Sequence, residues 1–245
     1  MDLQAPSDLT QTMQRLLSDL QQRGQVALFP HTWSLHFIYL PQRLFCNPHQ
    51  PAIISPLLHD DKSDDFRAKV AFERLAVLGG RVRDSMEASI SRPVSYAAQY
   101  LVEAECRQYL AWAFSSLYRM DPRMARTRAD PHEDCAMRCE EVLMRIKQEV
   151  QEQEQERESE DEEEGTCFGI AISGPIVALV ALNCGQHAAP VRTLHVCDFS
   201  DPDGDVWEAI ALALHIIHAR NDHYRQIQRL QTDSLQDQYA NIHIR

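Results

Sequence analysis

An apolar run at residues 166–183, TCFGIAISGPIVALVALN, constrains the fold of this chain most, and it follows directly on the most charged stretch of the sequence. Its internal turn signal is Gly174–Pro175, so the run predicts two β-strands of about eight residues folded into a tight hairpin. A third strand is expected at residues 191–199. Because the hairpin strands lack regular polar alternation, we expect a sheet covered on both faces and a mixed α/β architecture.

The composition is that of a globular protein with a substantial core. Of the 245 residues, 44% are apolar, including three Trp, seven Tyr and eight Phe, and we expect a single α/β domain over residues 1–245. The glycine–proline turn interrupts the run before it reaches the roughly 18 residues of a membrane span, and residues 1–14 lack the blocks of a secretory signal. The sequence therefore predicts an intracellular protein, cytoplasmic or nuclear, with no membrane contact.

The seven cysteines favour free or buried thiols over a disulfide framework. Their number is odd, and no two of them form a Cys-x-x-Cys pair. Disulfides are also uncommon in the reducing compartment expected for this chain.

The net charge of −12 is concentrated in one segment. Residues 149–164 contain ten acidic residues and one Arg, which leaves −3 for the rest of the chain. Such a block cannot bury enough apolar surface to fold alone, so we interpret residues 149–165 as a disordered acidic insertion that could bind a basic protein partner. Nucleic-acid binding elsewhere is not excluded, but it has weaker support.

Apolar periodicity predicts a helix-rich chain around the hairpin. The long helix at 94–117 is apolar nearly all round and should be central, with Glu105 and Gln108 as polar groups on a buried face. Residues 81–92 are expected to be a linker, and residues 231–245 a loose tail. The other expected helices lie at 8–23, 63–78, 133–150 and 205–230, and short strands at 26–29, 33–40 and 52–58.

Asp60 and Lys62 form the strongest candidate for metal-dependent chemistry. They are two residues apart at the end of an expected strand, so an extended backbone would project both side chains from one face. There the carboxylate of Asp60 could bind a divalent metal while the ammonium of Lys62 stabilises charge on a phosphate. No second carboxylate lies between Asp19 and Asp60, so a solvated loop in which Ser63 caps the next helix is the favoured interpretation.

Two further groups have helical spacings that could suit a metal, and each has a simpler interpretation. His215, His218 and Asp222 lie opposite the apolar stripe of the last helix, so a solvated polar face is favoured. The other group, His132, Cys135 and Cys139, lacks the residues to complete four ligands. The arginines at 119–130 are interpreted as part of a solvent-exposed loop. Binding of phosphates by these arginines is the less favoured alternative.

Two common enzyme classes find no motif in this sequence. The turn GIAISGP lacks the Gly-x-Ser-x-Gly elbow of serine hydrolases, and no glycine-rich phosphate loop is present. Serine hydrolase and nucleotide-dependent chemistry are therefore unsupported.

Four segments together resemble a known fold: AIISP at 52–56, QYLVEAECRQYLAW at 99–112, CFGIAISGPIVALVAL at 167–182 and VWEAIALALHIIHA at 206–219. In order, they look like the strand before an acid-x-Lys-Pro signature, a Gln-containing helix, a later hairpin and a closing helix. These are parts of the PD-(D/E)XK nuclease-like domains common in fungal proteins. The resemblance implies a restriction-endonuclease-like fold, with a central mixed sheet of about five strands flanked by helices.

The resemblance also implies a nuclease site, with Asp60, Lys62, Glu105 and Gln108 as candidate catalytic residues and Asp60 as the metal ligand. Gln99 is the alternative match to the family's helix glutamine. However, residues 54–56 are Ile, Ser and Pro where the family has its acid and lysine. Without those groups, phosphodiester cleavage loses its nucleophile activation and charge stabilisation.

We therefore expect a degenerate nuclease-like protein that acts by binding a partner, without a cofactor. One alternative is a nuclease with a displaced Asp/Lys site, which would need Mg²⁺ or Mn²⁺. The other is an accessory protein of a fungal biosynthetic pathway, which an apolar pocket lined by Trp33, Trp112 and Phe114 would favour. The oligomeric state stays open.

Overall fold

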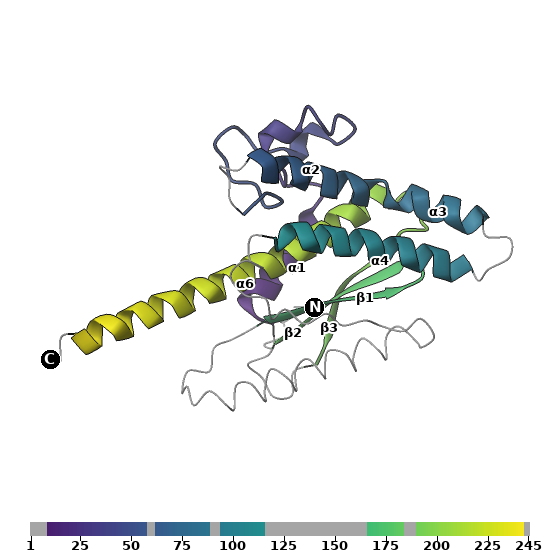
Figure 1. The fold of residues 1–245 in the computed structure, drawn as a ribbon. Coiled ribbons are helices and arrows are strands. Elements are labelled where there is room, and N and C mark those ends of the chain that lie inside the picture. The colour runs from purple at the N-terminus through teal and green to yellow at the C-terminus, as the bar shows by residue number, and fades with distance from the viewer. Residues whose placement is uncertain (1–8, 58–61, 89–93, 116–165, 184–189, 243–245) are drawn as a thin grey trace, which may run out of the picture.

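The computed structural model describes residues 9–57, 62–88, 94–115, 166–183 and 190–242. Within these ranges the helices are α1 Gln11–Gln22, α2 Lys62–Ala76, α3 Leu78–Ala88, α4 Val94–Ala113 and α6 Asp205–Ile242, and the strands are β1 Thr166–Ser173, β2 Ile176–Asn183 and β3 Arg192–Asp198. Helices α4 and α6 contact the sheet, and α2 and α3 lie beyond α4 on the side away from it (Figure 1). The chain is therefore a mixed α/β fold, as the sequence predicts.

The sheet confirms the expected hairpin and third strand. Its order is β1-β2-β3, and both neighbouring pairs are antiparallel. Gly174 adopts φ 57° in the turn between β1 and β2, a conformation that glycine tolerates without strain. The four successive residues 179–182 of β2 are all buried, so this central strand is covered on both faces.

The described residues form three strands, all antiparallel, where the resemblance implied a mixed sheet of about five. The difference lies in residues 26–58. Residues 31–33 and 42–44 form 3₁₀ turns, and a single bridge joins Phe29 to Phe45. Residues 52–57 form bends.

The strand expected at 33–40 is wrong because its apolar residues are not buried alternately. Trp33 and Phe37 are fully buried, whereas Leu35 and Ile38 are 88% and 83% exposed. In a strand, Leu35 would share the buried face with Trp33 and Phe37, whereas a helical turn places residues four apart on one face and leaves the residue between them outside it. The two buried rings pack on each other and on Phe29, and this aromatic cluster outweighs the local β-propensity.

The helix α1 begins where Thr10 caps it. The Thr10 hydroxyl accepts a hydrogen bond from the backbone N–H of Met13 at 3.2 Å, which satisfies one of the unpaired donors of the first turn. The helix therefore begins at Gln11, inside the expected range of 8–23. Leu16 and Leu20 then enter the core against α6.

The linker expected at 81–92 is wrong, because α3 covers Leu78–Ala88. Gly79 and Gly80 lie inside this helix rather than ending the preceding one. A Cβ at Gly79 would lie 1.9 Å from Oδ1 of Asp205, so glycine is required there for the close approach of α3 to the start of α6. Arg83 secures this contact with two hydrogen bonds of 2.6 Å to the Asp205 carboxylate.

Helix α6 is longer and more buried than expected. It continues to Ile242, beyond position 231 where a loose tail was predicted. The polar side expected to be solvated is not: His215 is 1% exposed and the side chain of His218 is 12% exposed. In Figure 1 the helix crosses the molecule and carries the C-terminus well beyond the other elements.

The cysteines follow the sequence prediction in part. Cys46, Cys106 and Cys197 are free and buried, as expected. Cys167 on β1 is disulfide-bonded, and its partner lies outside the described residues. The helix expected at 133–150 and the acidic insertion at 149–165 also lie outside them.

Candidate functional site

The pair Asp60 and Lys62 stays a prediction, because Asp60 lies outside the described residues. Lys62 is the first residue of the helix α2, not part of an extended segment. Acidic residues at positions 64 and 65 favour this helix start.

Glu105 is buried on α4, as predicted, but two arginines occupy its carboxylate. Arg74 donates two hydrogen bonds of 2.7 and 3.0 Å, and Arg81 donates one of 2.5 Å. Burial alone would raise the pKa of Glu105, but the hydrogen bonds and charges of Arg74 and Arg81 outweigh it and hold the pKa below its usual value. Both oxygens are engaged, so this carboxylate is a structural anchor between helices and not an open metal ligand.

Gln108 is exposed, so the prediction that it lies on the buried face of α4 is wrong. The buried arc of the helix runs through Val102, Glu105 and Tyr109. At about 100° of rotation per residue, Val102 and Tyr109 lie on one side of Glu105 around the helix. Gln108 lies about 60° away on the other side and so falls outside this arc. It has no part in a shared site with Glu105.

A different site lies between α1, residues 52–57 and the middle of α6. Here the structure has a pocket with a volume of about 350 Å³, which is in the range of small-molecule sites. Three arginines and one aspartate line it together with short apolar side chains. The lining residues are Arg15, Asp19, Ala52, Ile53, Ser55, Pro56, Leu57, His218, Arg220, Asn221 and Arg225.

Arg220 is the unusual member of this pocket. It is 2% exposed, and it forms no ion pair with a carboxylate of the described residues. Its Nη1 donates to the Ser55 carbonyl at 2.9 Å, and its Nε and Nη2 donate to Oδ1 of Asn221 at 3.0 and 2.8 Å. Burial lowers the pKa of the guanidinium to about 10, so the group is still cationic at neutral pH. The charge of Asp64 raises this pKa but does not offset burial. Because its hydrogen-bond acceptors are neutral, the cation retains positive charge for a ligand.

Two further arginines line the same pocket. Arg15 is exposed on α1. Arg225 lies about one helical turn after Arg220, and its Nη1 is 3.5 Å from Oδ1 of Asp222. Asp19, the single acid of the pocket, pairs with Nε2 of His218 at 2.8 Å. The pocket is therefore net positive in a chain whose overall charge is −12.

The group His215, His218 and Asp222 does not converge on a metal. Nε2 of His215 bonds the carbonyl of Gly169 on β1 at 3.0 Å, and burial lowers the pKa of this histidine to about 4. His218 bonds Asp19, and Asp222 accepts from Thr12 at 3.0 Å. The three side chains instead connect α6 to β1 and, at two positions, to α1, which is why this polar face is largely covered.

The three aromatic residues whose pocket would favour an accessory role in biosynthesis are buried side chains. Trp33, Trp112 and Phe114 are between 0% and 7% exposed, and they belong to the core. The two indole N–H groups donate to Asp65 at 2.7 Å and to Asp64 at 3.2 Å. These rings fix α2 in place and line no part of the pocket between α1 and α6.

The sequence contains a signal for Arg220 that the pattern analysis missed. Arg220 lies three residues after Ile217 and four before Tyr224, and both belong to the apolar stripe of the last helix. A charged residue on such a stripe is buried unless the helix ends, and a buried charge is a candidate for function.

No family model, curated protein or solved structure matches the chain. No helix of the described ranges combines the length and apolar character that crossing a membrane requires. The assignment of function therefore depends on the geometry of the pocket.

Proposed function

We propose that this protein acts by binding rather than catalysis, and that its pocket between α1, residues 52–57 and α6 takes a small organic anion. The observation that carries the proposal is Arg220, a guanidinium that is 2% exposed and hydrogen-bonds neutral oxygens only, with no carboxylate of the described residues within ion-pair distance. The charge of Asp64 acts on it from further away and offsets only part of the effect of burial on its pKa. Burying a charge costs stability unless a counter-charge compensates it. A bound anion would supply that counter-charge.

The lining of the pocket defines the chemistry of the ligand. A guanidinium binds the planar oxygens of a carboxylate or the oxygens of a phosphate by paired hydrogen bonds. Arg220 would hold this head group, with Arg15 and Arg225 at the same pocket. The opposite lining, Ile53 and Leu57, is apolar and suits a hydrocarbon or aromatic part. The ligand class is therefore an amphiphilic carboxylate or phosphomonoester.

The absence of catalysis is proposed from the state of Glu105. Both its oxygens bind arginines, so it does not supply the second carboxylate that a displaced nuclease site with Asp60 and Lys62 would need. We expect no cleavage of labelled single- or double-stranded DNA or RNA with Mn²⁺. Cleavage that is lost on Asp60→Ala would establish the nuclease alternative instead.

A degenerate nuclease-like origin remains part of this proposal. The support is the order of α4, the β1-β2 hairpin and the closing helix α6. Binding of a basic protein through residues 149–165 is a separate prediction, and a pull-down with and without this segment tests it.

The direct test of anion binding is calorimetric titration of the full chain with phenyl phosphate and benzoate. We expect saturable binding of at least one of them at one site, and a loss of about tenfold or more in affinity for Arg220→Met. Arg67→Met is the matched control, because Arg67 is exposed on α2 and outside the pocket. Equal affinity for the wild type and Arg220→Met, or no binding of either probe, would reject the proposal.

A further inference from the structure

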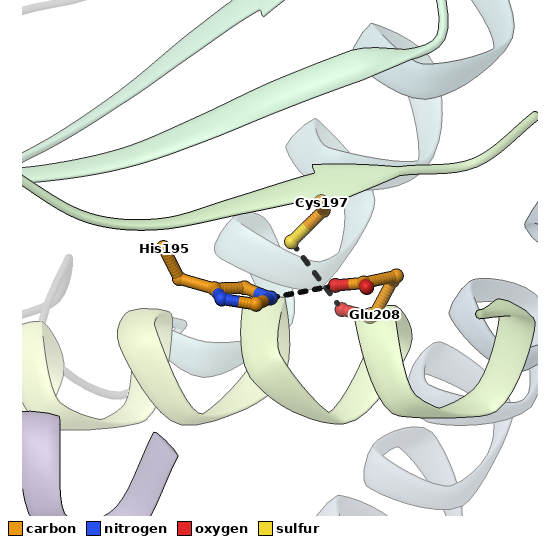
Figure 2. A group of neighbouring side chains, drawn as sticks. All are labelled: His195, Cys197 and Glu208. Carbon is orange, nitrogen blue, oxygen red and sulfur yellow. Dashed lines mark hydrogen bonds and ion pairs between the residues drawn. The ribbon is translucent and has the colours of Figure 1, made fainter. Parts of the chain in front are cut away.

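A second group of side chains lies between the sheet and helix α6, where β3 faces the first turn of α6. His195 and Cys197 are two residues apart on β3, so they point to the same face of the strand. That face meets Glu208 on α6, and Figure 2 shows the imidazole, the thiol and the carboxylate turned toward one another. The ligand atoms of the three residues lie within 4.8 Å of one another.

We propose that His195, Cys197 and Glu208 bind a divalent transition metal of the zinc type. Imidazole nitrogen, thiolate sulfur and carboxylate oxygen are together the donor set of zinc and cobalt, whereas magnesium and calcium prefer oxygen alone. Binding breaks the S–H bond of Cys197, forms a metal–sulfur bond and releases the proton to solvent.

The ligand atoms, which lie within 4.8 Å of one another, would shift by roughly 1 Å or less to surround a metal. In a tetrahedral site with bonds of about 2.0 to 2.3 Å, ligand atoms lie roughly 3.3 to 3.8 Å apart. Nε2 of His195 is 2.7 Å from Oε2 of Glu208, so this pair would separate by roughly 0.6 Å to admit the metal. Sγ of Cys197 lies 3.7 Å from the backbone oxygen of Glu208, and it already faces the same space.

Burial favours a stable site with one open position. Cys197 is fully buried, and the side chains of His195 and Glu208 are 22% and 15% exposed. Three protein ligands leave a fourth position of the tetrahedron for water. The metal would also cross-link β3 to α6, which are otherwise joined along the chain by the loop of residues 199–204.

The site has a clear structural alternative, in which His195 and Glu208 form an ion pair and Cys197 is a core thiol. Cobalt distinguishes the two, because thiolate coordination produces a charge-transfer absorption that an ion pair does not. The probe is Co²⁺ titrated into the reduced full chain, followed by displacement with Zn²⁺.

We expect one equivalent of Co²⁺ to give the charge-transfer band in the wild type and in Cys106→Ala. Cys106 is the matched control, because it is also a buried free thiol but lies outside the group. Cys197→Ala should lose the band. Glu208→Gln, which keeps the size of the side chain and its contact with His195, should weaken Co²⁺ binding by roughly tenfold or more.

Two outcomes would overturn the proposal. One is an undiminished band in Cys197→Ala, which would place the bound metal on other cysteines. The other is the absence of any band in a wild-type chain whose circular dichroism shows that it is folded.

Discussion

Replacing Arg220 with methionine should leave the protein at least as stable as the wild type, although it removes a buried side chain. Methionine has a similar length and no charge. Lowering the guanidinium pKa from the ordinary value of arginine to about 10 corresponds to a cost on the order of 3 kcal/mol for burying the charge. This cost is fully present below the folded pKa and is relieved only as the pH rises above about 10.

The substitution also removes hydrogen bonds, and this loss opposes the gain. Ser55 and Asn221 each lose a donor, at about 1 kcal/mol for each acceptor. The free energy of unfolding of Arg220→Met should therefore lie between the wild-type value and about 2 kcal/mol above it.

Urea unfolding near pH 7.5, in a buffer free of phosphate and carboxylates, measures this difference. The control Arg67→Met should stay within about 0.5 kcal/mol of the wild type. A loss of more than about 2 kcal/mol in Arg220→Met would mean that the guanidinium is a structural anchor, and the reasoning for an uncompensated charge would be refuted.

Three further predictions test the contacts described above. Glu105→Gln should lower the free energy of unfolding by about 2 to 4 kcal/mol in urea at pH 7, because it leaves two arginines without their partner. Since the pKa of Glu105 is lowered, its stabilising contribution is present above the unfolded pKa. The difference between the variant and the wild type should therefore shrink as the pH falls through the folded pKa. Burial lowers the pKa of His215 to about 4, so the wild type should lose stability as the pH falls from about 6.5 to 4. His215→Gln, which keeps a donor for the Gly169 carbonyl, should reduce this dependence of the unfolding free energy on pH, measured by urea titrations at successive pH values. An unchanged pH dependence would contradict the burial of His215. Gly79→Ala should lower the free energy of unfolding by about 1 to 3 kcal/mol, because the added Cβ displaces Asp205. In the control Gly80→Ala the added Cβ would have its nearest neighbour 4.0 Å away, so this variant should be neutral or stabilised by up to about 1 kcal/mol. Equal thermal midpoints for the two variants would show that Asp205 does not approach Gly79 closely.

Much of the fold could be predicted from the sequence where one pattern dominates. The turn at Gly174, the third strand and the positions of α1, α4 and α6 all follow from apolar periodicity, and so does the burial of Glu105. The errors occur where tertiary contacts decide. Gly79 is glycine because Asp205 approaches it, and the residues around Trp33 turn because two rings four residues apart share one aromatic cluster.

The functional sites were less predictable, because their residues are brought together by packing. Arg220 becomes unusual only when residues 52–57 and α1 enclose it while Asp19, the acid that α1 supplies to the pocket, pairs with His218 instead. His195 and Cys197 have the strand spacing that places them on one face, yet Glu208 meets them only because α6 turns back across β3. Neither juxtaposition has a signature within a single element.

The most direct test of the anion-binding pocket is the NMR signal of the Nε–H group of Arg220 in the ¹⁵N-labelled full chain, titrated with phenyl phosphate and benzoate. The assignment would come from the signal missing in Arg220→Met. We predict that the Arg220 signal shifts saturably with at least one of the two ligands, while the Nε–H signal of Arg74, which is held by Glu105, stays unchanged. An Arg220 signal that does not move with either ligand, or that moves only as much as that of Arg74, would contradict the proposed function.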